Sequence, residues 1–267
     1  PRGGGRAPGA VGLPPPARRR SPPISLVPLL GLAALCLALA APGPAPAQSR
    51  PVTVVELFTS QGCSSCPPSD AFLGELSMRP DIVALSFHVD YWDYIGWRDP
   101  FAAAEFTERQ RGYARSLRQR YVYTPEMVVQ GRGHDSGIER ANVLRLIEEA
   151  QKPDLPRLAP SLADRGAAGV SVSMPAFAAD GPCDVWLVTY DPERRTTVAR
   201  GENRGRELAN YNVVRSLTLL ARWDGSPAEI AIGPERLGDA RGVAILVQHP
   251  GLGPIFGAAA LVRASPR

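Results

Sequence analysis

Residues 52–76 read VTVVELFTSQGCSSCPPSDAFLGEL and decide the fold of the first part of the chain. The apolar, β-branched run from Thr53 to Phe58 predicts a buried strand. Gly62 begins a turn, and the two prolines after Cys66 are tolerated in the first turn of a helix but not inside one. The stretch therefore predicts a strand, a turn and a helix that begins near Cys66, with Cys63 at the exposed tip of the turn.

Cys63 and Cys66 are three residues apart at this junction, so they are close enough to form a small disulfide. The unpaired N–H groups of a helix N-terminus favour a thiolate. Cys63 is therefore the candidate attacking thiol, and Cys66 is the candidate that resolves a mixed disulfide on Cys63. The alternative is an inert structural disulfide. A zinc site would need two more ligands, and the chain has no second CxxC and three histidines, so we expect no metal and no cofactor.

The first 47 residues have the pattern of a secretory signal peptide. Three arginines (residues 18–20) precede an apolar run from Ile24 to Ala41, and Ala45-Pro46-Ala47 resembles a cleavage site. Export predicts a periplasmic or secreted protein, which meets the membrane only through this leader. In such an oxidising compartment disulfides persist.

The basic charge of the chain belongs to this leader. Removing the five arginines of residues 1–47 from the 30 basic residues leaves 25, against 26 acidic residues, a net charge of −1. No basic stripe remains, so the composition argues against a nucleic-acid partner.

Beyond Cys66 the pattern predicts alternating helices and strands up to a linker with three prolines at Lys152–Pro160. The expected elements are a helix over Ser69–Leu76, strands at Asp81–Val89 and Met127–Val129, a short strand within 130–137, and helices over 101–120 and Arg140–Ala150. An aromatic loop spans residues 90–100.

After the linker the pattern alternates with a period of two, which is typical of an antiparallel sheet. The expected strands are Val170–Met174, Val185–Tyr190, Thr196–Ala199, Tyr211–Leu220, Ala228–Ile232, Gly242–Gln248 and Ile255–Val262. We therefore predict an α/β protein with three parts: the signal peptide (1–47), an α/β domain (48–152) and a mainly antiparallel β domain (153–267).

The CxxC and the dipeptide Thr124-Pro125 ahead of a strand together resemble the thioredoxin superfamily. This resemblance implies a thioredoxin-like fold for the first domain. It also implies a cis proline at position 125 beside the cysteines, where its neighbours would bind an extended substrate. The catalytic candidates are then Cys63, Cys66 and Pro125, and Thr124 is a candidate substrate contact.

Four stretches more narrowly resemble a family of secreted bacterial proteins known as a domain of unknown function, of the DUF1223 type. They are ELFTSQGCSSCPP (56–68), FHVDYWDYIGWRDP (87–100), YTP (123–125) and GENRGR (201–206). The resemblance spans nearly all of the chain after the leader. It implies an exported location and no particular substrate.

Other residues have two interpretations each. His88 is either a strand-capping histidine or a proton relay, and Asp90 either starts a turn or accepts protons from the resolving thiol. Trp92 and Trp97 either bind an apolar substrate or pack the aromatic loop onto the domain. Cys183 is either buried and inert or exchanges with the CxxC. The turn at 201–206 suits anion contact or domain docking.

The predicted function is thiol–disulfide exchange with a protein or small-molecule thiol or disulfide. One alternative is a non-enzymatic copper-binding protein that uses Cys63, Cys66 and His88. Another is that the first domain is a scaffold and the β domain carries the function.

Overall fold

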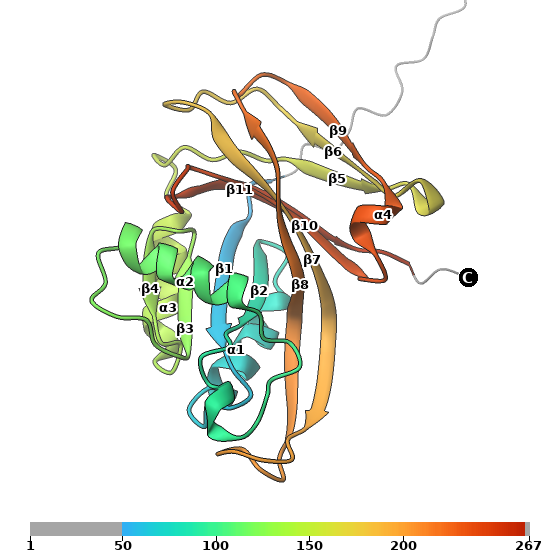
Figure 1. Cartoon of the computed structure of the whole chain (residues 1–267). Helices are drawn as coiled ribbons and strands as arrows, with labels where there is room; N and C mark the ends of the chain where they lie inside the picture. Colours follow the sequence, from blue (N-terminus) through green and yellow to red (C-terminus); the bar gives the residue numbers. More distant parts are fainter. Residues whose placement is uncertain (1–49, 265–267) are drawn as a thin grey trace, which may run out of the picture. The chain divides into compact units, whose positions relative to one another are not determined.

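The structure, a computed structural model, describes residues 50–264. The predicted signal peptide lies outside these residues. The described chain is a mixed α/β protein with one large, mostly antiparallel sheet and a smaller second sheet (Figure 1). The large sheet has eight strands in the order β11-β10-β7-β8-β2-β1-β3-β4, and the second has three in the order β5-β6-β9.

Strands β1 (Thr53–Thr59) and β2 (Ile82–His88) are parallel neighbours, joined by the helix α1 (Pro67–Ser77). Every residue of both strands is buried, which explains their nearly continuous apolar sequence. Strand β3 (Glu126–Val129) runs antiparallel to β1, and β4 (Gly133–Asp135) runs antiparallel to β3.

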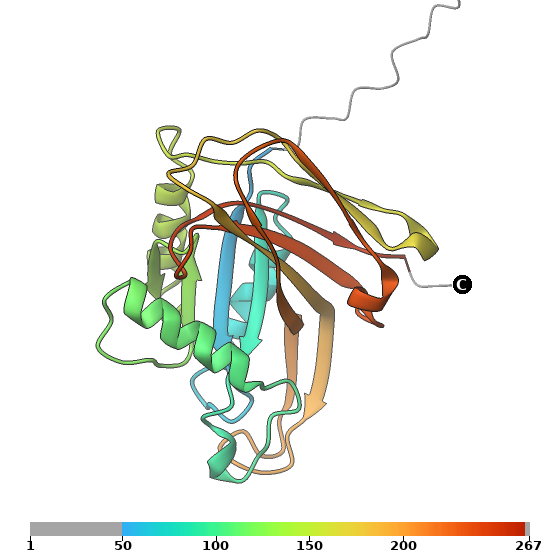
Figure 2. The ribbon, with the colours of Figure 1, turned by 45° about the horizontal axis from the view of Figure 1, so that its top comes forward.

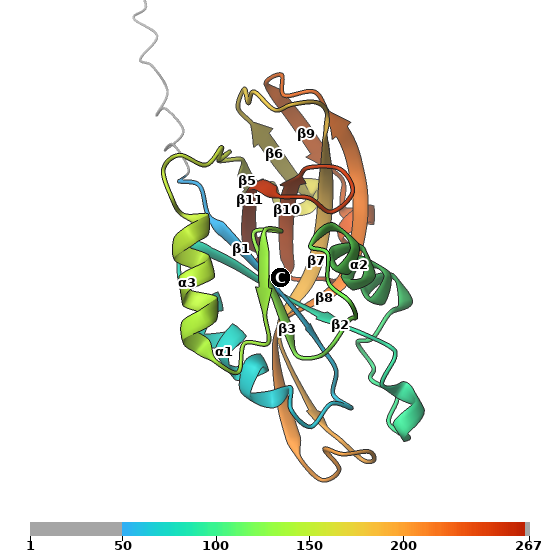
Figure 3. The ribbon, with the colours of Figure 1, turned by 90° about the vertical axis from the view of Figure 1, so that its left-hand side faces the viewer.

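Helices cover both faces of these four strands (Figure 3). Helices α1 and α3 (Arg140–Ala150) pack on one face, where Leu57, Leu73 and Ile147 share a core. Helix α2 (Ala104–Ser116) packs on the other face, where Phe106 and Tyr113 join a second core. Short 3-10 helices occupy Asp93–Ile95 and Gly166–Ala168.

Strands from the second half of the chain extend the same sheet. Strands β7 (Cys183–Thr197) and β8 (Glu207–Trp223) form a long hairpin, and β8 lies parallel to β2 with Ser86 opposite Val213. Strands β10 (Gly242–Gln248) and β11 (Ile255–Val262) continue the sheet beyond β7. Figure 2 shows the orange tip of the hairpin reaching toward the loop after β1.

The second sheet is made of β5 (Ser161–Asp164), β6 (Val170–Met174) and β9 (Ala228–Ile232). It packs against β7 and β10 through a third apolar core that includes Val172, Leu187 and Ile245. A short helix α4 (Pro234–Leu237) follows β9.

The predicted boundary between residues 152 and 153 does not separate two compact units. The described residues form one unit, because β7, β8, β10 and β11 complete the sheet that β1 and β2 begin. The mainly antiparallel pairing predicted for the second half is present, as are most of its strands. The two strands expected at Val185–Tyr190 and Thr196–Ala199 are one continuous strand, β7.

Local predictions in the first half agree closely with the structure. The main difference is α2, which ends near Ser116 rather than 120 because Arg118 has a positive φ of 57°. None of the helices within residues 50–264 has the length and apolar character needed to cross a membrane.

Candidate functional site

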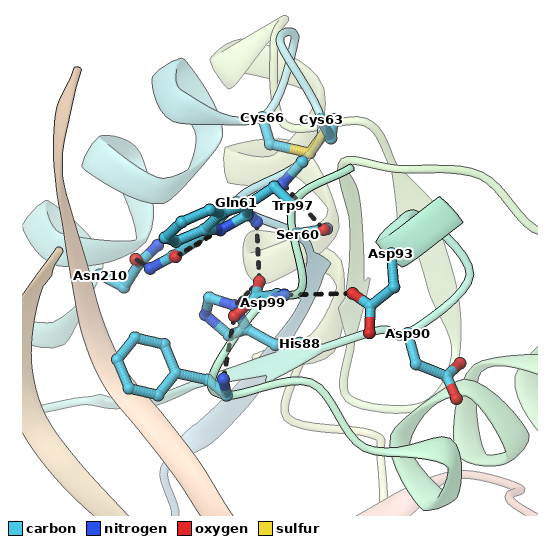
Figure 4. Close-up of polar contacts among 12 residues, drawn as sticks. Ser60, Gln61, Cys63, Cys66, His88, Asp90, Asp93, Trp97, Asp99 and Asn210 are labelled. Carbon is cyan, nitrogen blue, oxygen red and sulfur yellow. Dashed lines mark hydrogen bonds and ion pairs between the residues drawn. A yellow bond between two sulfur atoms is a disulfide. The ribbon is translucent and has the colours of Figure 1, made fainter. Parts of the chain in front are cut away.

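Cys63 and Cys66 form a disulfide in the loop between β1 and α1 (Figure 4), with Cα atoms 5.5 Å apart. Cys66 caps α1, and Pro67 opens the helix as the sequence predicts. The carbonyl of Cys66 accepts hydrogen bonds from the backbone N–H groups of Ser69 (2.9 Å) and Asp70 (3.1 Å). Cys66 is thus fixed to the first turn of the helix, while Cys63 lies in the preceding turn.

The expectation of an exposed Cys63 is wrong. Cys63 is 1% exposed and Cys66 is fully buried, whereas Ser64 and Ser65 between them are exposed. The predicted turn is present, but another part of the chain covers it.

The cover is the tip of the β7–β8 hairpin, residues 198–206. Asn203 Nδ2 donates to the carbonyl oxygens of Gln61 and Cys63, both at 2.9 Å. Glu202 Oε2 accepts from the backbone N–H of Ser64 at 3.1 Å. We call residues 198–206 the hairpin tip. Of the two expected roles for the 201–206 turn, the tip has the docking role, through these bonds.

The aromatic loop of residues 90–100 lies against both the disulfide turn, at Gly62, and the hairpin tip, at Gly201. Trp97 Nε1 donates to Gln61 Oε1 at 3.2 Å, and Trp92 Nε1 donates to Thr124 Oγ1 at 2.8 Å. A Cβ on Gly62 would lie 3.1 Å from Trp92 Cβ. Trp92 therefore links the turn that holds the disulfide to Thr124, so both tryptophans pack the loop in place.

The peptide bond between Thr124 and Pro125 is cis, as the resemblance implies. Pro125 is buried and leads directly into β3. The next residue, Glu126, is fully buried and accepts hydrogen bonds from Gln110 Nε2 (2.7 Å) and Gln119 Nε2 (2.6 Å). Burial raises the pKa of Glu126, while these amides and His134 oppose the shift.

His88 forms a buried ion pair beneath the disulfide turn. Its Nδ1 lies 2.7 Å from Asp99 Oδ2, and both side chains are fully buried. Asp99 also accepts from the backbone N–H groups of Gln61 (2.8 Å) and Phe101 (2.9 Å). Burial is the largest single influence and lowers the pKa of His88, but the attraction and hydrogen bond of Asp99, together with the attraction of Asp70, outweigh it, so the net pKa is raised. Burial raises the pKa of Asp99, but the attraction and hydrogen bond of His88 and the hydrogen bonds from Gln61 and Phe101 together outweigh it, so the net pKa is lowered.

Asp70 is a second buried acid of the site. It lies in the first turn of α1, on the face that packs against the sheet, and is 5% exposed. Burial raises the pKa of Asp70 to about 7, against the attraction of His88. A carboxyl group with this pKa can both hold and release a proton near neutral pH.

Asp90, the acid that the sequence suggests, has the turn role instead. Its carbonyl accepts from the N–H of Asp93 at 3.1 Å, and its carboxylate accepts from Thr107 Oγ1 at 2.6 Å. Figure 4 shows it turned away from the disulfide. It fixes the aromatic loop to α2.

Cys183 is remote from the disulfide. It is buried at the start of β7, opposite Trp223, whereas the hairpin tip follows Thr197 at the other end of the same strand. Burial, and secondarily Asp184, raise the pKa of its thiol. This placement fits the buried, inert interpretation.

No group of three or more His, Cys, Asp or Glu side chains in residues 50–264 is arranged to hold a metal ion. Cys63, Cys66 and His88 therefore do not form such a group in this structure.

Sequence reasoning missed Asp70, Asp99 and Asn203 as individual residues. Asp70 carries a usable signal, because it precedes Leu73 and Leu76 at a spacing of three and so falls on the buried stripe of the helix. An acidic residue in that stripe is unusual enough to be noticed. Asp99 and Asn203 carry no comparable local signal, since their roles come from contacts distant in sequence.

Comparisons with known proteins agree with the narrower resemblance. A crystal structure of a protein from Agrobacterium tumefaciens is similar at 32% identity with a TM-score of 0.71, over 82% of this chain and 98% of that one. HBP35 of Porphyromonas gingivalis is similar in fold, at 16% identity and a TM-score of 0.55, over 82% of this chain and 77% of that one. No curated protein matches the chain.

The model of one protein family matches residues 54–248, a span that includes the disulfide, the aromatic loop and the hairpin tip. The chain therefore belongs to the family described as "Protein of unknown function (DUF1223)".

Proposed function

We propose that this protein is an exported thiol–disulfide oxidoreductase that acts through Cys63 and Cys66. The observation that carries the proposal is the disulfide at the start of α1, joined through Trp92 to a cis Thr124–Pro125 bond. A purely structural disulfide would not require a cis proline that is linked to the disulfide turn through Trp92.

We also propose that the first half of the chain is thioredoxin-like. Four adjacent strands have the order β2-β1-β3-β4, with β1 and β2 parallel and β3 and β4 antiparallel. Helices α1 and α3 lie on one face and α2 on the other. The β7–β8 hairpin is an addition that extends this unit at β2.

The exchange begins when a substrate thiolate attacks Cys63 Sγ. A bond forms between the substrate sulfur and Cys63, the Cys63–Cys66 bond breaks, and its electron pair passes to Cys66 Sγ, which takes a proton. A second substrate thiolate then displaces Cys63, so that the substrate leaves as a disulfide and the protein holds two thiols. The reverse sequence reduces a substrate disulfide.

Cys63 is the sulfur assigned to attack because it precedes the helix, next to the exposed Ser64 and Ser65. Its Sγ lies 3.3 Å from the hydroxyl of Ser65, a group able to hydrogen-bond a thiolate. Cys66 is fixed at the helix cap and faces the interior. Access to Cys63 requires the hairpin tip to move, because Asn203 and Glu202 hold it over the turn.

The test is equilibration of the purified protein with glutathione buffers of graded redox poise. We expect reversible interconversion of disulfide and dithiol, and loss of that interconversion in Cys63→Ser and in Cys66→Ser. Cys183→Ser is the matched control and should behave as wild type. A disulfide that stays oxidised in every buffer, in folded protein, refutes the proposal.

The copper alternative is tested separately by titrating the reduced protein with Cu(I), with and without His88→Ala. We develop the redox proposal because Cys63 and Cys66 form a disulfide in a chain that also has a cis Thr124–Pro125 bond.

A further inference from the structure

Four buried polar side chains from four different strands and helices meet beneath the disulfide. They are Thr59 at the end of β1, Asp70 in α1, His88 at the end of β2 and Asn210 in β8. Thr59 and His88 are opposite each other in the sheet, and Asp70 interacts with all three.

Each of these side chains has a buried polar atom without a well-formed hydrogen bond in the part of the chain that the structure describes, although Thr59 and Asn210 lie close enough to Asp70 to lower its pKa. The atoms are Thr59 Oγ1, Asp70 Oδ1, His88 Nε2 and Asn210 Nδ2. Most buried polar atoms in proteins are hydrogen-bonded, so a group of exceptions in one place calls for an explanation. Two of these atoms, Asp70 Oδ1 and His88 Nε2, belong to groups that exchange protons.

Asp70 lies one helical turn after Cys66, the cysteine that needs a proton partner. It follows Cys66 by four residues, and its backbone N–H donates to the Cys66 carbonyl at 3.1 Å. Residues four apart lie on the same face of a helix. Because Cys66 is fully buried, a thiol or thiolate formed there needs an internal group to give or accept its proton.

His88, at the end of β2, and its partner Asp99 act on the charge of Asp70. Asp99 fixes Nδ1 of His88 at 2.7 Å and leaves Nε2 without a partner among residues 50–264. Asp99 also accepts from the N–H of Gln61, two residues before Cys63, so the pair is tied to the disulfide turn.

We propose that Asp70 is the proton donor and acceptor for Cys66 during thiol–disulfide exchange, with His88 and Asp99 as positioning residues that fix its charge state. This inference rests on the proposed function. When the Cys63–Cys66 bond breaks, its electron pair goes to Cys66 Sγ, which takes the proton from the Asp70 carboxyl group. In the opposite direction the Asp70 carboxylate takes the Cys66 thiol proton, Cys66 Sγ attacks Cys63 of a mixed disulfide, and the substrate leaves as a thiolate.

The electrostatics of the cluster suit this role. The titratable groups that act on Asp70 are His88 from β2 and Asp99 from the loop before α2, and Cys66 lies one turn earlier, at the cap of the same helix. Thr59 from β1 and Asn210 from β8 do not titrate. Burial brings the pKa of Asp70 to about 7, and a protonated His88 nearby stabilises the carboxylate that remains after the proton has moved.

The experiment separates the two steps on the full chain. Reduced protein is mixed with a chromogenic aromatic disulfide in a stopped-flow instrument. The first released aromatic thiol reports attack by Cys63, and the second reports attack by Cys66 on the mixed disulfide. Wild type, Asp70→Asn and the exposed helix control Glu75→Gln are compared from pH 5 to pH 9.

We expect Asp70→Asn to slow the second phase at pH 7 by about 100-fold, since general acid–base catalysis contributes roughly 10²–10⁴-fold. The first phase should change by less than about threefold, and the second phase should regain speed at alkaline pH, where the thiol ionises unaided. Glu75→Gln should match wild type in both phases.

A second phase that keeps its wild-type rate and pH profile in Asp70→Asn overturns the role of Asp70 and leaves the proposed function intact. Absence of both phases in wild type contradicts the proposed function itself. If Asp70→Asn does not fold, the pH profile of the wild-type second phase decides the matter. An ionisation near neutral pH supports Asp70, and a single ionisation near the ordinary thiol pKa of about 8.5 refutes it.

Discussion

Replacing Asn203 with alanine should uncover the disulfide. Asn203 is fully buried in the hairpin tip, and its Nδ2 donates to the carbonyl oxygens of Gln61 and Cys63. The substitution removes both of these bonds, and also the bond that Asn203 Oδ1 accepts from Arg206 within the tip, and leaves the fold of the sheet untouched, because no strand contains this residue.

The size of the effect follows from the two lost bonds. A hydrogen bond contributes about 1 kcal/mol net, so the covered state loses about 2 kcal/mol relative to the open one. Since 1.4 kcal/mol is a factor of ten, the open population should rise by about 30-fold. If the hairpin tip must move before the reductant can attack, the rate at which a small thiol reduces the disulfide should rise by the same factor.

The assay is the pseudo-first-order rate of disulfide reduction, followed by trapping the new thiols and measuring mass. Arg204→Ala is the matched control, because this exposed neighbour makes no contact with the disulfide turn among the described interactions. If the reduction rate of Asn203→Ala lies within twofold of the rates of wild type and Arg204→Ala, the claim that the hairpin tip shields the disulfide is refuted.

Three further outcomes are expected. The Asp70 carboxyl has a pKa of about 7 in the folded protein and about 3.9 in the unfolded chain. Between about pH 4 and pH 7 the folded protein therefore keeps the Asp70 proton, whereas the unfolded chain has lost it. Its contribution to stability is therefore complete below about pH 4, and the free energy of unfolding falls by on the order of 4 kcal/mol as the pH rises to about 7. Urea titrations of the wild type should show this fall with pH, and those of Asp70→Asn should lack it. Trp92→Phe removes the bond to Thr124 and should cost about 1 kcal/mol in urea unfolding, with a loss below about 0.3 kcal/mol contradicting the link. Cys183→Ala should leave the rate of disulfide exchange unchanged, and a rate lowered tenfold would mean that this thiol takes part.

The elements nearest the cysteines follow from local sequence because their determinants are local. Pro67 and Pro68 set the start of α1, the β-branched run sets β1, and Thr124-Pro125 marks the entry to β3. Strands β6, β9, β10 and β11 have the bounds that alternation and turns predict, for the same reason.

Long-range contacts explain what local pattern does not predict. Alternation in the second half is compatible with a separate sheet, and it is the pairing of Val213 with Ser86 that joins β8 to β2. Cys63 has a sequence context typical of an exposed turn. It is buried because Asn203, 140 residues later, closes over it. The sequence does not mark Asp70 as functional, because acidic residues are common in the first turn of a helix, where the helix dipole stabilises a surface carboxylate.

The most direct test of the central claim is trapping of a mixed disulfide. Reduced Cys66→Ser protein is incubated with oxidised glutathione, digested and examined by mass spectrometry. The account predicts one glutathione adduct, on Cys63, which is released by added thiol and is missing from the Cys63→Ser protein. An adduct confined to Cys183, or no adduct on folded protein, would contradict the assignment of Cys63 as the attacking sulfur.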